Sequence, residues 1–117
     1  MVRYQGFMHY NAASLVNYAA KSLELWNQPC PVFVRSIGME GSIGPVASNM
    51  HHSMVMRMPG IDVVSPMTPK EWHRAWTSFL IGNKPVYCSE HRNSFSVNYE
   101  IPNKLPFKKP DVTIFGI

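Results

Sequence analysis

Residues 59–90 read PGIDVVSPMTPKEWHRAWTSFLIGNKPVYCSE, and this stretch decides the fold class. The apolar runs 61–66 and 84–90 are short and rich in β-branched or aromatic residues, which indicates two buried strands. The segment 68–83 between them carries the signals of a capped helix. These signals are Thr68 at the N-cap, Pro69 at the first helical position and Gly82 just after the end. A strand, a helix and a second strand in this order predict a unit with parallel strands.

The same alternation continues toward the N-terminus. Leu15, Ala19 and Leu23 recur at helical spacing, whereas CPVFVR is a compact apolar run. The additional predicted elements are strands at 2–7 and 30–35 and helices at 12–26 and about 48–57. The order predicts an α/β fold with three layers, α/β/α, around a mostly parallel sheet. Ligands of such sheets bind beyond the carboxyl ends of the strands, which here lead into the loops 36–47 and 65–69.

The alternating pattern stops near residue 92. Residues 93–110 are rich in proline and asparagine, which predicts a linker. DVTIFGI, at 111–117, predicts one more strand, either the first strand of a following domain or an edge strand. We therefore expect the alternating α/β unit to span residues 1–92.

The composition describes one globular domain and argues against two classes of partner. Of 117 residues, 45% are apolar and 15% are charged, and the apolar runs fall short of the roughly 20 residues that a membrane span needs. The net charge of +4 is spread along the chain without a basic stripe, which argues against nucleic-acid binding. Cys30 and Cys88 lack the spacing of a zinc site, and no apolar signal segment follows Met1. We therefore expect buried thiols and a cytoplasmic location.

The run CPVFVRSIGMEGSIGPVASNMHHSMVMRMPGIDVVSPMTPKEWHRAWTSFLIGNKPVYCSEHR carries a family resemblance. PGIDVVSPMTP, followed by a helix and NKPVYCSEH, resembles the pyrimidine-binding domain of transketolase-like enzymes that depend on thiamine diphosphate. The resemblance is greatest to the β subunit of the decarboxylating component of 2-oxoacid dehydrogenase complexes. NYAAKS and DVTIFGI extend it over nearly the whole chain. It implies the thiamine-diphosphate-binding fold, with the pyrimidine domain incomplete.

The resemblance also implies a function and partners. It implies a β-subunit-like part of a decarboxylating, acyl-transferring 2-oxoacid dehydrogenase, active only with an α-subunit-like chain. In the family that partner binds the diphosphate and its Mg²⁺ ion, so we expect no metal in this chain, weak binding of thiamine diphosphate by the chain alone, and a homo- or hetero-oligomer. The alternative is a non-catalytic assembly or regulatory module that retains the fold.

The family resemblance assigns one cofactor-binding residue. Phe7 falls at the position of an aromatic ring that packs against the aminopyrimidine of the cofactor, and the alternative is an ordinary core residue. The family's glutamate, which bonds the pyrimidine, comes earlier in the family pattern than Met1 and is absent from this chain.

The catalytic candidates are His51 and His52. Where the related β subunits carry an active-site histidine, this chain has Ala47. In a helix over 48–57, His51 points back toward Ala47 and His52 toward Ser48, so His51 is the preferred replacement. The alternative is that both are half-exposed helix residues beside a buried stripe formed by Met50, Met54 and Met58.

The remaining groups favour structural roles. A zinc site of His51, His52 and His91 is disfavoured because adjacent helical residues point about 100° apart. On the helix 68–83, Trp72, Trp76 and Phe79 predict the buried face, and Glu71, His73 and Arg74 the solvated face. Glu90, His91 and Arg92 favour a structural or interface role. Some family members hold a potassium ion with the loop that corresponds to 81–85, but side chains cannot test this, and no metal is assigned.

Overall fold

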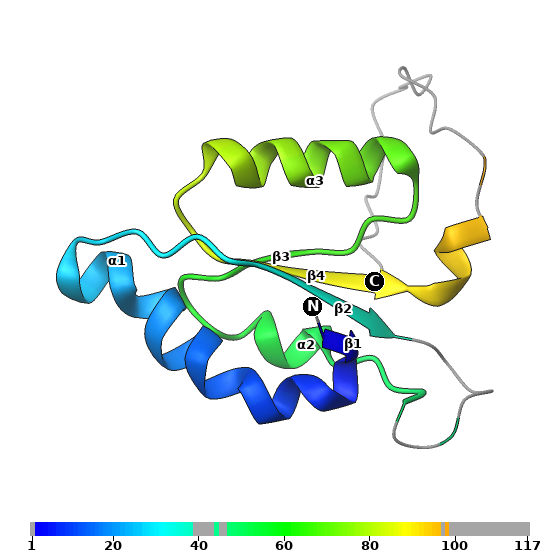
Figure 1. Cartoon of the computed structure of the whole chain (residues 1–117), viewed down its shortest axis with the longest axis horizontal. Coiled ribbons are helices and arrows are strands. Elements are labelled where there is room, and N and C mark those ends of the chain that lie inside the picture. Colours follow the sequence, from blue (N-terminus) through cyan, green and yellow to red (C-terminus); the bar gives the residue numbers. More distant parts are fainter. Residues whose placement is uncertain (1, 39–43, 45–46, 97, 99–117) are drawn as a thin grey trace, which may run out of the picture.

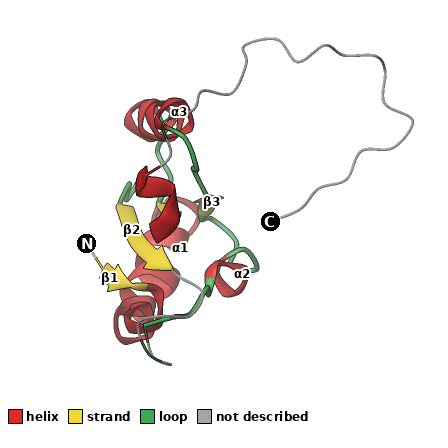
Figure 2. Ribbon diagram, turned by 90° about the vertical axis from the view of Figure 1, so that its right-hand side faces the viewer, coloured by secondary structure: helices red, strands yellow, loops and turns green. Residues whose placement is uncertain are grey.

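The computed structural model describes residues 2–38, 44, 47–96 and 98. The described strands form one parallel four-stranded sheet in the order β1-β2-β4-β3. Their bounds are Val2–Tyr4 for β1, Phe33–Gly38 for β2, Asp62–Val64 for β3 and Val86–His91 for β4. Figures 1 and 2 both place helix α3 on one side of the sheet and α1 and α2 on the other. The predicted α/β/α architecture with a parallel sheet is confirmed.

Three helical segments follow β1 almost without interruption. They are the 3₁₀-helix η1 (Gln5–Asn11), the π-helix η2 (Ser14–Ala19) and the α-helix α1 (Ala20–Trp26). The helix predicted at 12–26 is therefore confirmed, and it ends where Asn27 adopts a left-handed conformation with φ of 52°. The strand predicted at 2–7 is wrong for its second half, which is helical. The chain turns after Tyr4 because the Gln5 side chain bonds beneath the ends of β2 and β4.

The strand predicted at 30–35 lies three residues further along the chain. Pro29 and Pro31 have no N–H groups to donate to a neighbouring strand, so regular pairing does not start with them. At the other end, β2 pairs with β4 in register from Phe33 opposite Val86 to Gly38 opposite His91. Pairing with β4 therefore carries β2 past the apolar run that marks it in the sequence. The strands predicted at 61–66 and 84–90 are confirmed as β3 and β4, with β3 shorter because its chain leads into Pro66.

The helix predicted at about 48–57 is reduced to α2, which spans His52–Val55. Residues 48–51 are not helical, and His51 donates its backbone N–H to the side-chain Oε1 of Gln5 at 2.5 Å. The chain before α2 packs closely on the end of β2, where a Cβ atom at Gly38 would overlap the Met50 sulfur and lie 3.2 Å from the Asn49 carbonyl. A tertiary contact therefore replaces the first turn of the predicted helix.

Two expectations about this segment are corrected. Ala47 and His51 do not share a helix face, because Ala47 lies in a turn before α2. The methionines do not form a buried stripe either, since Met54 is 49% exposed and the buried residue of α2 is Val55.

Helix α3 (Pro69–Ile81) has the caps that the sequence predicts. Thr68 accepts a hydrogen bond from the Glu71 N–H, and the Glu71 carboxylate accepts one from the Thr68 N–H, which completes a capping box. Glu71 is therefore a capping residue and not only part of a solvated face. The helix covers the sheet through a cluster of aromatic rings around Phe33, whose centroids lie 5.0–6.2 Å apart; the α3 members are Trp72, Trp76 and Phe79. The predicted buried face is only partly covered, since Trp76 is 46% exposed.

The main core lies on the opposite side of the sheet. Its buried members come from η1, η2, α2 and β4: Met8, Leu15, Ala19, Val55 and Tyr87. Gly60 follows α2 with a φ of +81°, and a side chain there would collide with the Ala20 carbonyl. Only glycine therefore lets the chain leave α2 against the start of α1 and enter β3.

The residues after β4 begin as a short helix, although a linker is predicted from residue 93. Arg92–Ser96 form the 3₁₀-helix η3. Residues 99–117, with the predicted strand at 111–117, lie outside the described residues, as does most of the loop 39–46. Within the described ranges, no helix is long and apolar enough to cross a membrane.

The α3 capping box predicts a measurable loss of stability. Thr68→Ala removes the acceptor of the Glu71 N–H at a residue that is 1% exposed, so we expect the free energy of unfolding to fall by about 1 kcal/mol in urea titrations. Thr77→Ala, on the exposed surface of the same helix, is the matched control and should change stability by less than about 0.5 kcal/mol. Equal losses in the two variants would contradict the capping assignment.

Candidate functional site

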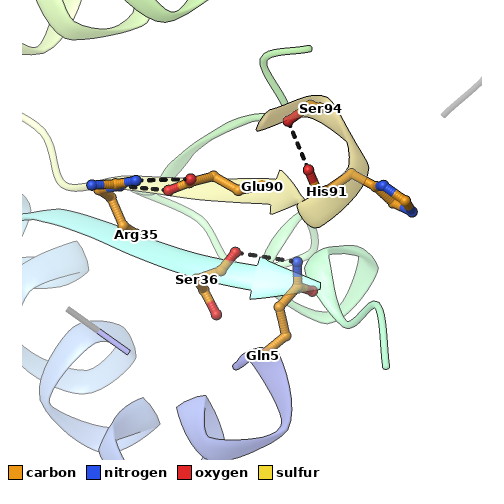
Figure 3. A network of polar contacts seen from close by, with 6 residues as sticks. All are labelled: Gln5, Arg35, Ser36, Glu90, His91 and Ser94. Carbon is orange, nitrogen blue, oxygen red and sulfur yellow. Dashed lines mark hydrogen bonds and ion pairs between the residues drawn. The ribbon is translucent and has the colours of Figure 1, made fainter. Parts of the chain in front are cut away.

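Polar side chains converge where β1, β2 and β4 end, at the edge where parallel sheets bind ligands. Gln5 follows β1, Ser36 lies near the end of β2, and Ser89 lies near the end of β4; all three are fully buried. Figure 3 shows Gln5 beneath the end of β2, with its side-chain nitrogen directed at the Ser36 carbonyl. His51 and His52 reach the same region from the start of α2.

Gln5 has hydrogen bonds at both ends of its amide. Its Oε1 accepts the backbone N–H of His51, which can only donate. Its Nε2 lies 2.7 Å from the Ser89 Oγ, 3.5 Å from the Ser36 carbonyl oxygen and 3.9 Å from the Met50 sulfur. A carbonyl oxygen can only accept, so the contacts on both sides require the same orientation of the amide. Gln5 therefore joins three strands to the chain that precedes α2.

The ring of His52 is held by Ser89. Its Nδ1 lies 3.2 Å from the Ser89 Oγ, which already accepts from Gln5. The buried Ser89 hydroxyl proton needs an acceptor, and the His52 Nδ1 lies within hydrogen-bond distance to accept it. A neutral His52 then carries its proton on Nε2, so the chain Gln5, Ser89, His52 selects one tautomer. The predicted orientation of His52 toward Ser48 required both residues to lie in one helix, but Ser48 precedes α2, and the His52 ring contacts Ser89.

His51 is held through its backbone while its ring is half-exposed. The ring meets that of His9, from η1, edge to face with centroids 5.1 Å apart. The helical argument that directs His51 toward Ala47 does not apply, because His51 precedes the first turn of α2 with φ of −117° and ψ of 11°. The catalytic role of either histidine stays a prediction.

Phe7 lies in η1, two residues after the Gln5 that follows β1. Its side chain is 42% exposed, and its ring centroid lies 6.1 Å from that of Tyr4. A ring with this exposure presents surface that a flat ligand can cover, which fits the aromatic wall of a pyrimidine site.

An ion pair occupies the other face of the sheet. The Arg35 guanidinium donates two hydrogen bonds to the Glu90 carboxylate, at 2.5 and 2.9 Å, and Glu90 is fully buried (Figure 3). The guanidinium carbon also lies 5.0 Å from the centre of the Trp72 ring. The hydrogen bonds that the Glu90 carboxylate accepts raise the pKa of Arg35. Glu90 therefore links β2 to β4, in agreement with the structural role that the sequence favours for it.

His91 does not join the other histidines. Its Nδ1 accepts the Asn93 N–H, and its carbonyl accepts the Ser94 hydroxyl. Figure 3 shows this second bond and the His91 ring pointing away from Gln5. In the described part of the chain, no three His, Cys, Asp or Glu side chains are arranged to hold a metal ion.

Two buried hydroxyls and a buried thiol lie within β2 and β4. The Ser36 Oγ and the Tyr87 hydroxyl have no hydrogen-bond partner of good geometry among the described residues. Burial raises the pKa of Tyr87, and the neighbouring Ser36 hydroxyl partly opposes that change. Burial also raises the pKa of Cys88 to about 12, so this thiol stays protonated near neutrality, whereas Cys30 is half-buried. Both cysteines are free, and the expectation of a buried thiol holds for Cys88.

A larger cleft of about 640 Å³ lies on the α3 side of the sheet, away from the two candidate histidines. It runs between β3 and α3, and the loop after α3 forms part of its wall. Its lining includes Val64, Pro66, Arg74, Ser78 and Lys84. The cleft is open to solvent, and the buried polar groups and histidines gather elsewhere. We therefore place the candidate site at the strand ends.

Residues 2–97 match the family model described as transketolase, pyrimidine binding domain. This match covers most of the chain and all ten described elements, from β1 to η3. The chain belongs to this family. No curated protein matches the chain.

The structure brings together only some of the site residues that the sequence predicts for this pyrimidine-binding domain. On the α1 and α2 side of the sheet, η1 follows β1 and carries Phe7, and the start of α2, which follows β2 along the chain, carries the His51-His52 pair. Two further residues, Gln5 and His9, are missed by the sequence analysis. Nothing in the run YQGFMHY marks either one, because their contacts reach residues more than 40 positions away.

The contacts of Gln5 predict that the pyrimidine-binding domain depends on this one amide. Gln5→Leu keeps most of the volume but leaves the His51 N–H without its acceptor and removes the contacts of Nε2 with Ser89 and the Ser36 carbonyl, so we expect a loss of about 2–3 kcal/mol in unfolding free energy. Gln28→Leu, at an exposed residue, is the matched control and should be nearly neutral.

A second measurement separates the hydrogen-bond network from packing alone. In the parent, ¹⁵N spectra of the histidine rings should show His52 as the tautomer protonated on Nε2, and Ser89→Ala should make the two tautomers more equal. Equal tautomer populations in the parent would contradict the proposed chain from Gln5 through Ser89.

Proposed function

We propose that this pyrimidine-binding domain is a β-subunit-like part of a thiamine-diphosphate-dependent 2-oxoacid dehydrogenase and acts only with a cofactor-binding partner. The family match supports a domain of thiamine-diphosphate enzymes. The finer assignment is supported by the resemblance of PGIDVVSPMTP and NKPVYCSEH to the β subunits of these dehydrogenases. The observation that carries the proposal is Phe7, which is 42% exposed near the end of β1 in a domain of a pyrimidine-binding family.

The residues present fit one wall of a cofactor site. Phe7 would stack against the aminopyrimidine ring of thiamine diphosphate, because an aromatic side chain offers a flat apolar face. Bound thiamine diphosphate supplies the electron sink that decarboxylation of a 2-oxoacid requires. Ligands for the diphosphate and Mg²⁺ are assigned to the partner, in keeping with the resemblance to α and β subunits.

The proton-transfer role is proposed for the pair of histidines. His51 is the candidate favoured from sequence, on the basis of a helix face that the structure does not form. His52 has the better-defined ring, since the Ser89 contact directs its protonated Nε2 away from the buried network. A positioned ring with one fixed tautomer is what a general acid or base requires. We therefore rank His52 above His51 for this role.

Exposed aromatic residues support the need for a partner. Tyr10, on η1 with Phe7, is 86% exposed, and Tyr18, on the following η2, is 65% exposed. Large aromatic side chains on one exposed segment are typical of protein interfaces. The proposed partner is an α-subunit-like chain that binds the diphosphate.

A non-catalytic assembly module is the second candidate. It is favoured by Ala47, which occupies the place of the family's active-site histidine. The two functions differ in whether a complex that contains this chain turns over a 2-oxoacid.

The cofactor wall gives the first functional prediction. The chain alone should show no micromolar binding of thiamine diphosphate with Mg²⁺ in calorimetric titrations, because one aromatic wall is only part of the site. After co-production with an α subunit of a 2-oxoacid dehydrogenase, the complex should bind the cofactor. Phe7→Ala should weaken that binding by about 1 kcal/mol or more, while Leu80→Ala, at an exposed residue of α3 on the other side of the sheet, should not. Micromolar binding by the isolated chain would overturn the two-subunit proposal.

The histidine pair gives the second functional prediction. In the complex, His52→Ala should lower turnover of the 2-oxoacid by roughly 10²-fold, the usual scale for a positioned proton-transfer group, and His51→Ala should lower it less. Cofactor binding should be unchanged in both variants, which separates chemistry from assembly. A complex that binds cofactor but retains full turnover in the double variant would exclude both histidines. A complex that assembles and never turns over would favour the non-catalytic module.

A further inference from the structure

The segment MHHSMVMRM, at 50–58, has a methionine content that the proposed function does not explain. Four of its nine residues are methionines and two are histidines, and it contains no carboxylate. Thioether sulfur and imidazole nitrogen are uncharged donors of the soft and intermediate classes. The segment folds into the turn before α2, α2 itself and the turn after it, so its donors lie on a short, curved stretch of chain.

The structure brings further donors of the same kind to this segment. His9 and Met8 belong to η1, more than 40 positions away, and the His9 ring lies edge to face with His51 at a centroid distance of 5.1 Å. Both elements line one small pocket of about 60 Å³, roughly the volume that two water molecules occupy in the liquid. The wall residues that carry thioether or imidazole donors are Met8, His9, His51, Met54 and Met58, and the oxygen-bearing residues are Gln5 and Tyr87.

The pocket has a solvent side and a core side. His9 is exposed and Met54 is 49% exposed, so both can reach an ion that arrives from water. His51 and Met58 are half-buried, and Met8 is buried in the core. The other walls are mostly apolar, among them Ala12, Val16 and Val55. An ion held there would have soft donors on one side and a water-excluding surface on the other.

We propose that His9, His51 and Met54 form a binding site for a soft monovalent cation, Cu(I), with Met58 as a further ligand. Thioether donors select Cu(I) among the biological metals, and imidazole also suits copper. An uncharged ligand set with no carboxylate is a poor site for Mg²⁺, Ca²⁺ or Mn²⁺. Zn²⁺ favours thiolate, imidazole and carboxylate ligands, of which the pocket offers only imidazole. The site does not depend on thiamine diphosphate or on the proposed partner.

The test must first remove competition from thiols. Cys30 is half-buried and free, so the measurements use the Cys30→Ser chain. Cys88 needs no replacement because it is fully buried and its pKa is raised to about 12, which keeps the thiolate from forming near neutrality. Cu(I) is titrated without oxygen against a chromogenic chelator. Ag(I), which is not oxidised under these conditions, is titrated in parallel against protein with ¹³C-labelled methionine methyl groups.

The expected result is one equivalent of bound Cu(I) and a shift of the Met54 and Met58 methyl resonances with Ag(I). His9→Ala and Met54→Leu should each weaken Cu(I) binding by about tenfold or more. Both residues are exposed enough for the variants to fold, which circular dichroism confirms independently. The matched controls are His73→Ala and Met67→Leu, at exposed residues that do not line the pocket, and they should bind as the parent does.

Three results would overturn the proposal. One is binding no tighter in the parent than in the His9→Ala, Met54→Leu double variant. Another is Cu(I) binding that the His73 or Met67 controls weaken as much as the pocket variants do. The third is equal affinity for Zn²⁺ with no effect of Met54→Leu, which would indicate a site made of histidines alone.

Discussion

The buried amide of Gln5 is the constraint on which the rest of the structure depends. It is fully buried, and its contacts reach β2, β4 and the chain before α2. A buried amide without partners is costly, so these elements must stay together for the folded state to be stable. One end of the amide accepts a hydrogen bond from His51, and the other end donates one to the Ser36 carbonyl. A carboxylate could make only the first of these bonds, and an apolar side chain could make neither. The turn after β1 and the short length of α2 both follow from this single residue.

Buried polar groups have different kinds of partner on the two faces of the sheet. On the α1 and α2 side, neutral groups form a chain from Gln5 through Ser89 to His52. On the α3 side, the Glu90 carboxylate is fully buried and requires its cation, since a buried charge that loses its partner is strongly destabilising. Trp72 of α3 covers that cation, so the helix depends on the ion pair as well as on the rings around Phe33. On the α1 and α2 side, the partners that hold the two histidines, Gln5 and Ser89, carry no charge. This suits a ring that transfers a proton or binds a metal ion through an uncharged nitrogen.

Local signals explain which parts of the fold the sequence predicts. Thr68, Pro69 and Gly82 act within one or two turns, so α3 is found with the correct caps. The shift of β2 arises from pairing with β4, and the shortening of α2 arises from Gln5, and both are contacts between distant residues that no local pattern contains. The same distinction holds for the site. The pair His51-His52 is conspicuous in sequence, whereas Gln5 and His9 acquire their roles only when η1 is folded beneath the sheet.

His51 and His52 are adjacent in sequence, yet the structure holds them in opposite ways. Gln5 binds the His51 backbone and leaves its ring beside His9 and the methionines, while Ser89 binds the ring of His52. A ring whose Nδ1 accepts from a buried hydroxyl has one nitrogen left for chemistry, whereas the ring of His51 has no such restraint from Ser89 and can turn to meet an ion. The non-helical conformation of His51 produces this divergence, because it separates the two side chains before α2 begins. The proposed proton transfer and the proposed soft-metal site therefore use different rings. A change at Gln5 would disturb both, through the His51 backbone on one side and through Ser89 on the other.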